Sequence, residues 1–246
     1  IATTHVFCQQ MFFFFNDTAT TEIYTTFVED IDDLVLEVVD DLYLRKFSGS
    51  TDAPVLGHAS AVKVAREAMR DRQAQLVPTD SDPDGEPGLR VRLAVAARMD
   101  VDRRKRVRKL LDYDDLLTRL RDVLVDAEHG AAARQRVRDR YRVVLVDEFQ
   151  DTDPVQWEIL ETAFHGATTL VLVGDPKQAI YAFRGADLVT YLTAAASAST
   201  WRTLDHNWRS DPALLDCLES LFGGAALGDY RIVVRHVRPV WTGTRV

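Results

Sequence analysis

The chain has 246 residues, of which 46% are hydrophobic and 28% charged, enough to form one apolar core and to begin a second domain. No apolar run approaches the roughly eighteen residues of a membrane span, and the amino end lacks a signal-peptide pattern. We therefore expect a cytoplasmic protein without membrane contact. The formal net charge of -8 argues against a protein that coats nucleic acid through bulk positive charge, although it permits a local binding groove.

Charged residues are distributed unevenly along the chain. Basic residues cluster within 103–109 and 134–142, and acidic residues within 29–41. Each basic cluster fits either a solvated helix face or a phosphate-contacting surface. The two cysteines, Cys8 and Cys217, lie far apart and outside any metal-ligand spacing, which favours reduced thiols over a disulfide or a zinc site.

Residues 12–26 differ in composition from the rest, with four consecutive Phe followed by a Thr-rich run. The segment resembles the translation of a sequencing adapter, so we interpret it as a suspect non-native insert. The alternative is an exposed apolar wedge or partner site, which would favour aggregation.

Apolar spacing predicts mostly helical structure before residue 126 and mixed structure after it. Helical periodicity covers 27–45, 59–76 and 89–125, with a loop of Pro, Gly and Asp at 77–88. Short apolar runs at 143–146 and 169–173 predict parallel strands covered on both faces, with 154–164 as the crossover helix. A short strand at 203–204 and a helix at 214–222 follow.

Acidic and amide side chains follow the two predicted strands. Asp147 is suited to hold Mg²⁺ against nucleotide phosphates, and Glu148 to orient or deprotonate an attacking water. The turn at 174–178 can present the Gln178 amide to a γ-phosphate, because an amide donates and accepts without adding charge. Taken alone, each pattern also fits exposed residues at the end of a strand.

Two further segments combine aromatic and cationic side chains. Tyr181, Phe183 and Arg184 suit stacking on unpaired bases and contact with phosphates, although one of the two rings can equally be a core residue. Trp208 and Arg209 place an indole beside a guanidinium, which would stack on a purine and reach a terminal phosphate. Such a pair, taken alone, is usually structural.

Together these segments resemble the UvrD-like helicases of superfamily 1, and among them the RecB branch. The resemblance rests on residues 147–152, 174–187 and 204–210, with 113–117 and 4–8 as further elements. It implies an α/β fold: a RecA-like P-loop NTPase motor domain with a parallel sheet, a helical insertion, and the start of a second RecA-like domain.

The resemblance also implies a role for each residue of the site. Glu148, Gln178 and Arg209 would be catalytic, as water activator, γ-phosphate contact and arginine finger. Asp147 would bind Mg²⁺, Trp208 would stack on adenine, and Arg184 would link the DNA strand to the nucleotide. The residues implied to contact DNA are His5, Phe7, Tyr181 and Phe183. The implied cofactors are ATP and Mg²⁺, and the implied partners are single-stranded and duplex-end DNA with RecC- and RecD-like subunits.

The same resemblance divides the chain into segments. Residues 1–11 would end the first piece of the motor domain, 27–110 would form the insertion, 111–200 would complete the motor domain, and 201–246 would begin the second. The sequence contains no Gly-x-x-x-x-Gly-Lys-Ser/Thr loop, whose amides and lysine cradle phosphates. We therefore expect that this chain alone does not hydrolyse ATP. With half of the nucleotide cleft missing, its core would leave apolar surface exposed, so we also expect poor solubility.

The function implied by the resemblance is that of an ATP-dependent 3′–5′ DNA helicase in recombinational repair. Two alternatives stay open at this point. One is a catalytically inactive DNA-binding remnant that kept the aromatic platform and lost the motor. The other is a different helicase of the same superfamily, of the AddA, Rep or UvrD type.

Overall fold

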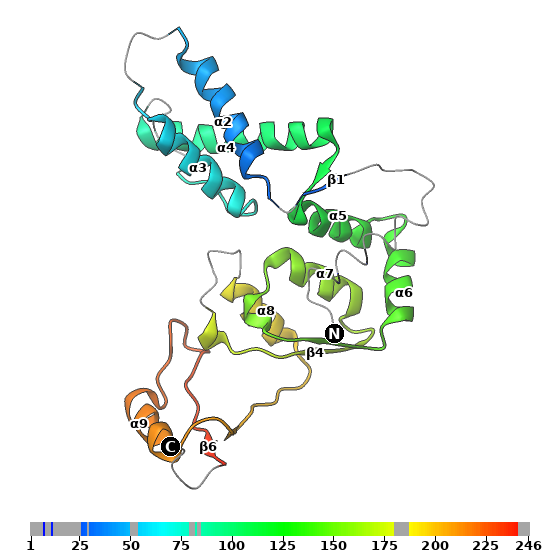
Figure 1. Cartoon of the computed structure of the whole chain (residues 1–246). Coiled ribbons are helices and arrows are strands. Elements are labelled where there is room, and N and C mark those ends of the chain that lie inside the picture. Colours follow the sequence, from blue (N-terminus) through cyan, green and yellow to red (C-terminus); the bar gives the residue numbers. More distant parts are fainter. Residues whose placement is uncertain are drawn as a thin grey trace.

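The structure is a computed structural model, and it describes residues 7, 11, 26–28, 30–49, 54–78, 82, 85–179 and 187–240. Within these ranges the elements form three groups that follow one another along the chain and lie one after another in Figure 1. None of the helices in the described ranges has the length and apolar character needed to span a bilayer.

The first group is a three-helix unit. It comprises α2 (Asp32–Phe47), α3 (His58–Arg70) and α4 (Glu86–Arg108). Its apolar core is formed by one face of each helix and includes Val35, Val38, Ala61, Ala65, Ala97 and Val101. The short strand β1 (Thr26–Phe27) runs parallel to β2 (Leu110–Leu111), so Thr26, the last residue of the suspect segment, pairs with Leu110.

The second group, which we call the sheet unit, alternates helices and strands. Helices α5 (Tyr113–Val125) and α6 (Gly130–Arg140) precede β3 (Val143–Val146). The 3-10 turn η1 (Phe149–Asp151), α7 (Pro154–Phe164) and β4 (Thr169–Leu172) follow. The unit closes with the turn η2 (Pro176–Gln178) and α8 (Leu188–Ser197).

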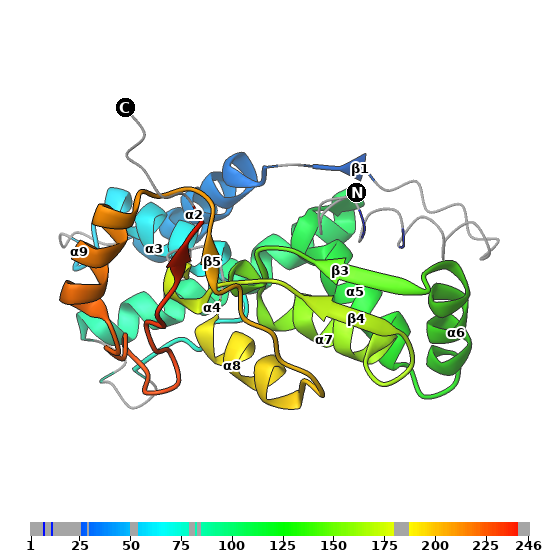
Figure 2. The ribbon, with the colours of Figure 1, turned by 90° about the horizontal axis from the view of Figure 1, so that it is seen from below.

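Strands β3 and β4 pair in parallel, with Val143 opposite Thr169 and Val146 opposite Leu172, and α7 is the crossover helix. Figure 2 shows the two strands side by side with α7 along them. Both α5 and α7 begin with a capping box, in which Asp112 or Asp153 accepts from the third helical amide. These caps fix where the helices start.

The sheet is covered on one face only within the described residues, so the prediction of two covered faces is wrong there. Val144, Val146, Leu170 and Leu172 pack on the core formed by α5, α6 and α7. The alternate residues point away, and Val143 and Leu145 are 63% and 64% exposed. Because successive strand side chains alternate in direction, covering one face leaves every second apolar residue in solvent.

The third group is small. Strand β5 (His206–Asn207) pairs in parallel with β6 (Arg238–Pro239), and α9 (Pro212–Phe222) lies between them in sequence. The strand expected at 203–204 is wrong, because the chain there is irregular and pairing begins at His206. The prediction missed the position because two residues, Thr203 and Leu204, are too few to define a strand or its register.

The predicted helices differ from the structure in number and in some boundaries, since five were predicted and the structure describes the bounds of eight, α2 to α9. Helix α7 matches its predicted range of 154–164. Helix α3 ends at Arg70 rather than 76, and the predicted segment 89–125 is split where Lys109 takes a left-handed conformation (φ 54°). Helix α4 begins at Glu86, inside the predicted loop. Helix α6 was not predicted, because its Arg-rich sequence has little apolar periodicity.

Candidate active site

The carboxyl end of β3 presents the first two predicted site residues. Asp147 and Glu148 directly follow the strand and are both exposed. Glu148 adopts the left-handed backbone region (φ 51°, ψ 41°), which costs a residue with a Cβ about 1 kcal/mol or more. Its amide donates to Asp147 Oδ1 at 3.0 Å. The turn therefore holds two neighbouring carboxylates at the carboxyl end of β3.

Phe149 anchors this turn in the core. Its side chain is 1% exposed and packs edge-on to Trp157 at 5.4 Å and against Tyr191 at 5.9 Å between ring centroids. Its amide donates to the Val173 carbonyl at 2.9 Å. The β3–β4 pairing thus continues into the turn that carries Glu148.

Gln150 joins the ends of the two strands. It is 2% exposed, and its Nε2 donates to Glu148 Oε2 at 2.7 Å while its Oε1 accepts from the Asp175 amide at 3.0 Å. A buried side-chain amide with both ends satisfied has one preferred placement. Gln150 therefore fixes the Glu148 carboxylate relative to the turn after β4.

Gly174 lies where the turn after β4 comes close to the turn after β3, and a side chain would not fit there. A Cβ at this position would lie 2.8 Å from Gln150 Oε1 and 3.1 Å from the amide nitrogens of Phe149 and Gln150. Two of these three atoms belong to the backbone, so they cannot move away cheaply. The absence of a side chain lets the two turns lie in contact.

The turn after β4 carries Asp175, Lys177 and Gln178. Partial burial opposes ionisation of Asp175, but hydrogen bonds from the Lys177 side chain and amide outweigh it and lower the pKa of this carboxyl. Lys177 Nζ lies 2.6 Å from Asp175 Oδ1, and Gln178 Nε2 donates to Asp175 Oδ2 at 3.4 Å. Gln178 is exposed, so its amide remains accessible from solvent.

Helix α8 is fixed to both turns. The Asp187 amide donates to the Thr152 carbonyl at 3.4 Å, and the Tyr191 hydroxyl donates to the Gly174 carbonyl at 3.3 Å. Asp187 also caps α8 by accepting from the amides of Val189 and Thr190. Asp187 therefore anchors the start of α8 beside the turn after β3.

Four predicted site residues lie outside the described part of the chain, namely His5, Tyr181, Phe183 and Arg184. Phe7 is described, is partly buried, and packs edge-on to Tyr141 at 5.7 Å and near Phe164 at 6.1 Å. This packing gives Phe7 a structural role beside the predicted contact with DNA.

Trp208 and Arg209 lie in a turn that follows β5. Asn207 Oδ1 accepts from the amides of Arg209 and Ser210 at 2.9 and 2.7 Å, which fixes the turn. Trp208 is 67% exposed, and Arg209 is also exposed. Arg209 forms no ion pair with Asp147 or Glu148, all three being described residues. The structure therefore brings Asp147, Glu148 and Gln178 together and leaves Trp208 and Arg209 in a separate turn.

The chemistry of the site suits a hard divalent cation with oxygen ligands. Asp147 and Glu148 offer exposed carboxylates at a strand mouth, and Mg²⁺ is normally held by one or two such groups together with waters and phosphates. Among the described residues no three His, Cys, Asp or Glu side chains group into a complete protein-only metal cage. Asp147 therefore fits the cation as a partial ligand.

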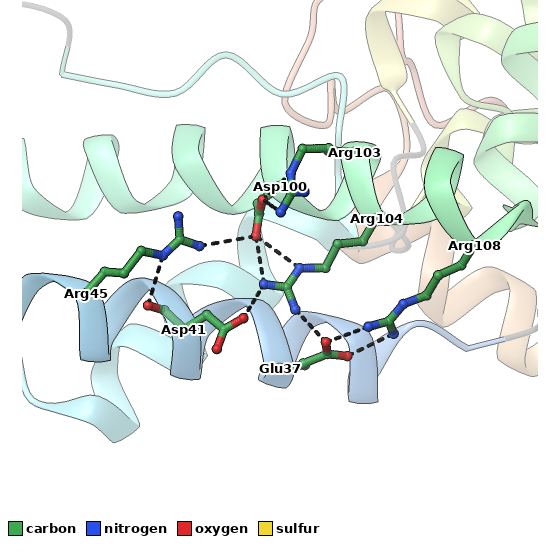
Figure 3. Close-up of polar contacts among 7 residues, drawn as sticks. All are labelled: Glu37, Asp41, Arg45, Asp100, Arg103, Arg104 and Arg108. Atoms are coloured by element: carbon green, nitrogen blue, oxygen red, sulfur yellow. Dashed lines mark hydrogen bonds and ion pairs between the residues drawn. The ribbon is translucent and has the colours of Figure 1, made fainter.

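The basic cluster on α4 forms ion pairs with acids of the same unit. Arg104, 8% exposed, lies 2.6 Å from Glu37, 2.5 Å from Asp41 and 3.0 Å from Asp100 (Figure 3). Arg108 forms a forked pair with Glu37 at 2.5 and 2.8 Å, and this hydrogen bonding lowers the pKa of Glu37. The acids of α2 thus neutralise Arg104 and Arg108 of this basic cluster.

The second basic cluster, on α6, binds the ends of neighbouring helices. Arg134 donates to the Leu124 carbonyl at 2.5 Å, where α5 ends. Arg138 donates to the carbonyls of Ala163 and Thr162, at 2.6 and 3.2 Å, in the last turn of α7. Cations at carboxyl ends of helices satisfy unpaired carbonyls and oppose the helix dipole. These two arginines are therefore structural.

Sequence reasoning gave no role to Gln150 or Gly174, although both lie within the motifs that it singled out. A Gln after an apolar residue and a Gly at a strand end are each compatible with any surface turn. Their importance depends on the register of β3 against β4, which a single sequence does not display.

Comparison with known proteins assigns the family. Residues 1–199 match the UvrD/REP helicase N-terminal domain. The chain belongs to the UvrD/REP helicase family. The two turns at the ends of β3 and β4, with Asp147, Glu148 and Gln178, lie inside the matched region.

Among UvrD/REP helicases the chain is similar to RecB subunits of the RecBCD enzyme. It is 49% identical over 246 residues to the protein of Mycolicibacterium smegmatis. This alignment covers 100% of this chain and 22% of the relative. It is 44% identical over 235 residues to that of Mycobacterium tuberculosis, covering 96% of this chain and 21% of the relative. The Escherichia coli protein is 46% identical over 127 residues, covering 51% of this chain and 11% of the relative. The chain thus spans about a fifth of the length of the two mycobacterial relatives.

Proposed function

We propose that this chain is part of a RecB-like, ATP-dependent 3′–5′ DNA helicase that couples ATP hydrolysis to translocation on one strand and unwinding of duplex ends in recombinational repair. The observation that carries the proposal is the Glu148–Gln150–Asp175 link, because it joins the turn after β3 to the turn that carries Gln178, the two segments to which the resemblance assigns nucleotide chemistry. RecC- and RecD-like subunits are the proposed partners, since the similar proteins are named as RecBCD subunits.

Each site residue has a proposed task. Glu148 takes a proton from, or orients, the water that attacks the γ-phosphate, and Gln178 contacts that phosphate through its amide. Asp147 would hold Mg²⁺, which neutralises phosphate charge when bound. The proposed partners of Trp208 and Arg209 are the adenine and the γ-phosphate, which requires their turn to approach the β3–β4 edge.

The proposed contacts with DNA involve a different set of residues. Tyr181 and Phe183 stack on bases, Arg184 links the strand to the nucleotide, and His5 and Phe7 approach from another loop. We also propose that residues 27–110 are the helical insertion of the motor domain, and that 201–246 begin a second RecA-like domain. ATP would then bind between the sheet unit and that second domain.

The experiment that tests this proposal uses the complete helicase that contains this chain, so that a phosphate loop is present. We expect ATP hydrolysis stimulated by single-stranded DNA. Glu148→Gln should lower kcat by a hundredfold or more while ATP binding is kept, because it removes the base and retains the shape. Glu158→Gln, an exposed position on α7, is the matched control and should leave hydrolysis unchanged.

The outcome distinguishes the two classes of function. Binding of single-stranded DNA without any ATP hydrolysis by the complete protein would favour the DNA-binding remnant and overturn the proposal. Equal kcat for the parent and the Glu148→Gln variant would remove Glu148 from the mechanism.

A further inference from the structure

The loop that follows α3, residues 71–74, has a defined conformation. Asp71 Oδ1 accepts from the amides of Gln73 and Ala74 at 3.1 and 3.0 Å. Arg98 of α4 donates to three carbonyls around it, those of Ala68 at 2.9 Å, Asp71 at 2.6 Å and Ala74 at 3.1 Å. These hydrogen bonds attach the loop to α4, within its own three-helix unit, and they do not depend on its contacts with the sheet unit.

From this loop Arg72 reaches across to the start of α5. Its guanidinium pairs with Asp102 of α4, with Asp115 at 3.2 Å and with Asp112 at 3.8 Å. Although burial opposes the charged form, these three carboxylates raise the pKa of Arg72, so it stays charged. One side chain thus spans the last part of α4 and the first turn of α5.

Lys105 strengthens the same junction from α4. It is 3% exposed, and its Nζ lies 2.5 Å from Asp112 Oδ2 and 2.6 Å from Asp115 Oδ2. Asp112 and Asp115 also form the capping box of α5. The two cations and the cap therefore share the same pair of carboxylates, so a change at one affects the others.

A second contact leads from the loop to α7. The side chain of Gln73 lies near Asp153 and opposes the rise in pKa that burial imposes on this carboxyl. Asp153 caps α7 by accepting from the Gln156 amide at 2.8 Å. The loop thus contacts the starts of two helices of the sheet unit.

Apolar packing does not provide an equivalent connection. Among the described residues, the core of the three-helix unit and the core of the sheet unit have no residue in common. In Figure 1 the two units lie on either side of the junction between α4 and α5. Among the described residues, the polar contacts of the loop, the β1–β2 pair and the chain itself connect the two units.

We propose that residues 71–74 are a clasp that holds the three-helix unit and the sheet unit at one mutual angle, and that the ion pairs of Arg72 keep the clasp closed. Opening the clasp frees the angle between the units without unfolding either core. The clasp acts on the geometry of the chain and does not depend on nucleotide chemistry, so its failure would leave the proposed function standing.

The test measures the distance between the two units in the full chain. In a Cys8→Ser, Cys217→Ser background, spin labels are attached at Glu67→Cys on α3 and Glu158→Cys on α7, both exposed positions. Double electron–electron resonance then gives the distribution of distances. We expect Arg72→Gln to widen this distribution while circular dichroism shows unchanged helix content. Hydrogen exchange at the Asp115 and Leu116 amides should accelerate about tenfold.

Two further variants make the test specific. Arg66→Gln breaks an exposed ion pair with Asp32, 3.4 Å long, inside the three-helix unit, and should leave the distribution unchanged. Asp102→Asn should widen it less than Arg72→Gln, because it removes a pair inside the three-helix unit and keeps the pairs of Arg72 with Asp112 and Asp115, and the double variant should be no wider than Arg72→Gln alone. An Arg72→Gln distribution as narrow as that of the parent would overturn the proposal. Joint unfolding of both units in Arg72→Gln would also overturn it, since Arg72 would then be part of a single core.

Discussion

The side-chain amide of Gln150 donates to the Glu148 carboxylate at 2.7 Å, and it does so from a position that is 2% exposed. The same amide group accepts from the Asp175 backbone at 3.0 Å. A surface carboxylate is therefore held by a buried partner that also holds the neighbouring turn. The placement of Glu148 depends on the core as much as on its own backbone.

Replacing Gln150 with Leu should destabilise the chain. The substitution keeps the volume but leaves the Asp175 amide without an acceptor and Glu148 without a donor, which costs about 1–3 kcal/mol in the free energy of unfolding. Urea denaturation followed by circular dichroism measures the change. Gln135→Leu, where the amide donates to Asp139 on the exposed face of α6, is the control and should change stability by less than about 0.5 kcal/mol. Equal effects of the two variants would contradict a special role for Gln150.

Gly174→Ala should also destabilise the chain, for a steric reason. The added Cβ would lie 2.8 Å from Gln150 Oε1 and 3.1 Å from two backbone nitrogens, so the turns must separate. We expect a loss of about 1–3 kcal/mol, measured by thermal and urea unfolding. Gly49→Ala, where a Cβ meets nothing within 4 Å, is the control. If the Gly174→Ala protein is as stable as the parent and hydrogen exchange at the Asp175 amide is unchanged, the turns after β3 and β4 are not in tight contact.

The sequence located the elements that have both a clear apolar pattern and residues that mark where the element begins or ends. Helix α7 was predicted over its full length because Asp153 and Pro154 mark its start and an apolar stretch continues to Phe164. Strands β3 and β4 were located because each is a short apolar run followed by an acid. The same apolar runs predicted two covered faces, whereas the described residues cover only one.

The candidate site was located by its motifs, but its internal contacts were not. The link from Glu148 to Asp175 needs β3 and β4 in register, which is a relation between residues 25 or more apart in sequence. The basic clusters were likewise ambiguous, since the Glu37 partner of Arg104 is 67 positions away. Local composition cannot separate a solvated arginine from one paired across two helices.

Arg104 should contribute more to stability than an exposed arginine on the same helix. It contacts Glu37, Asp41 and Asp100 from a side chain that is 9% exposed (Figure 3). Arg104→Gln removes the cation and leaves neighbouring carboxylates that repel one another, so we expect a loss of about 2 kcal/mol. Urea denaturation at low and high salt measures it. Arg90→Gln, which breaks an exposed pair with Glu86, should cost less than about 0.5 kcal/mol. Equal losses of unfolding free energy in the two variants would show that the ion pairs of Arg104 stabilise the chain no more than an exposed pair does.

Asp114 provides a prediction on pH dependence. Burial raises the pKa of Asp114 to about 6, and the carboxylates of Asp112 and Asp153 add to the rise against the opposing Arg72 and Lys105. The folded chain therefore binds this proton more tightly than the unfolded chain does. Stability from this group is present below about pH 4 and is lost as the pH rises toward about 6.

Asp114→Asn should accordingly stabilise the chain near neutral pH and have little effect in acid. Ionising Asp114 in the folded state costs roughly 2 kcal/mol at pH 7 to 8, and Asn avoids that cost. Urea unfolding of the parent and the variant from pH 4 to pH 8 gives the difference between them, which cancels the other titrating groups. Asp122→Asn, on the exposed side of the same helix, is the control. A difference between Asp114→Asn and the parent that stays constant over this range would show that Asp114 does not titrate there, because only a carboxyl that gains its charge between pH 4 and 7 makes the difference grow with pH.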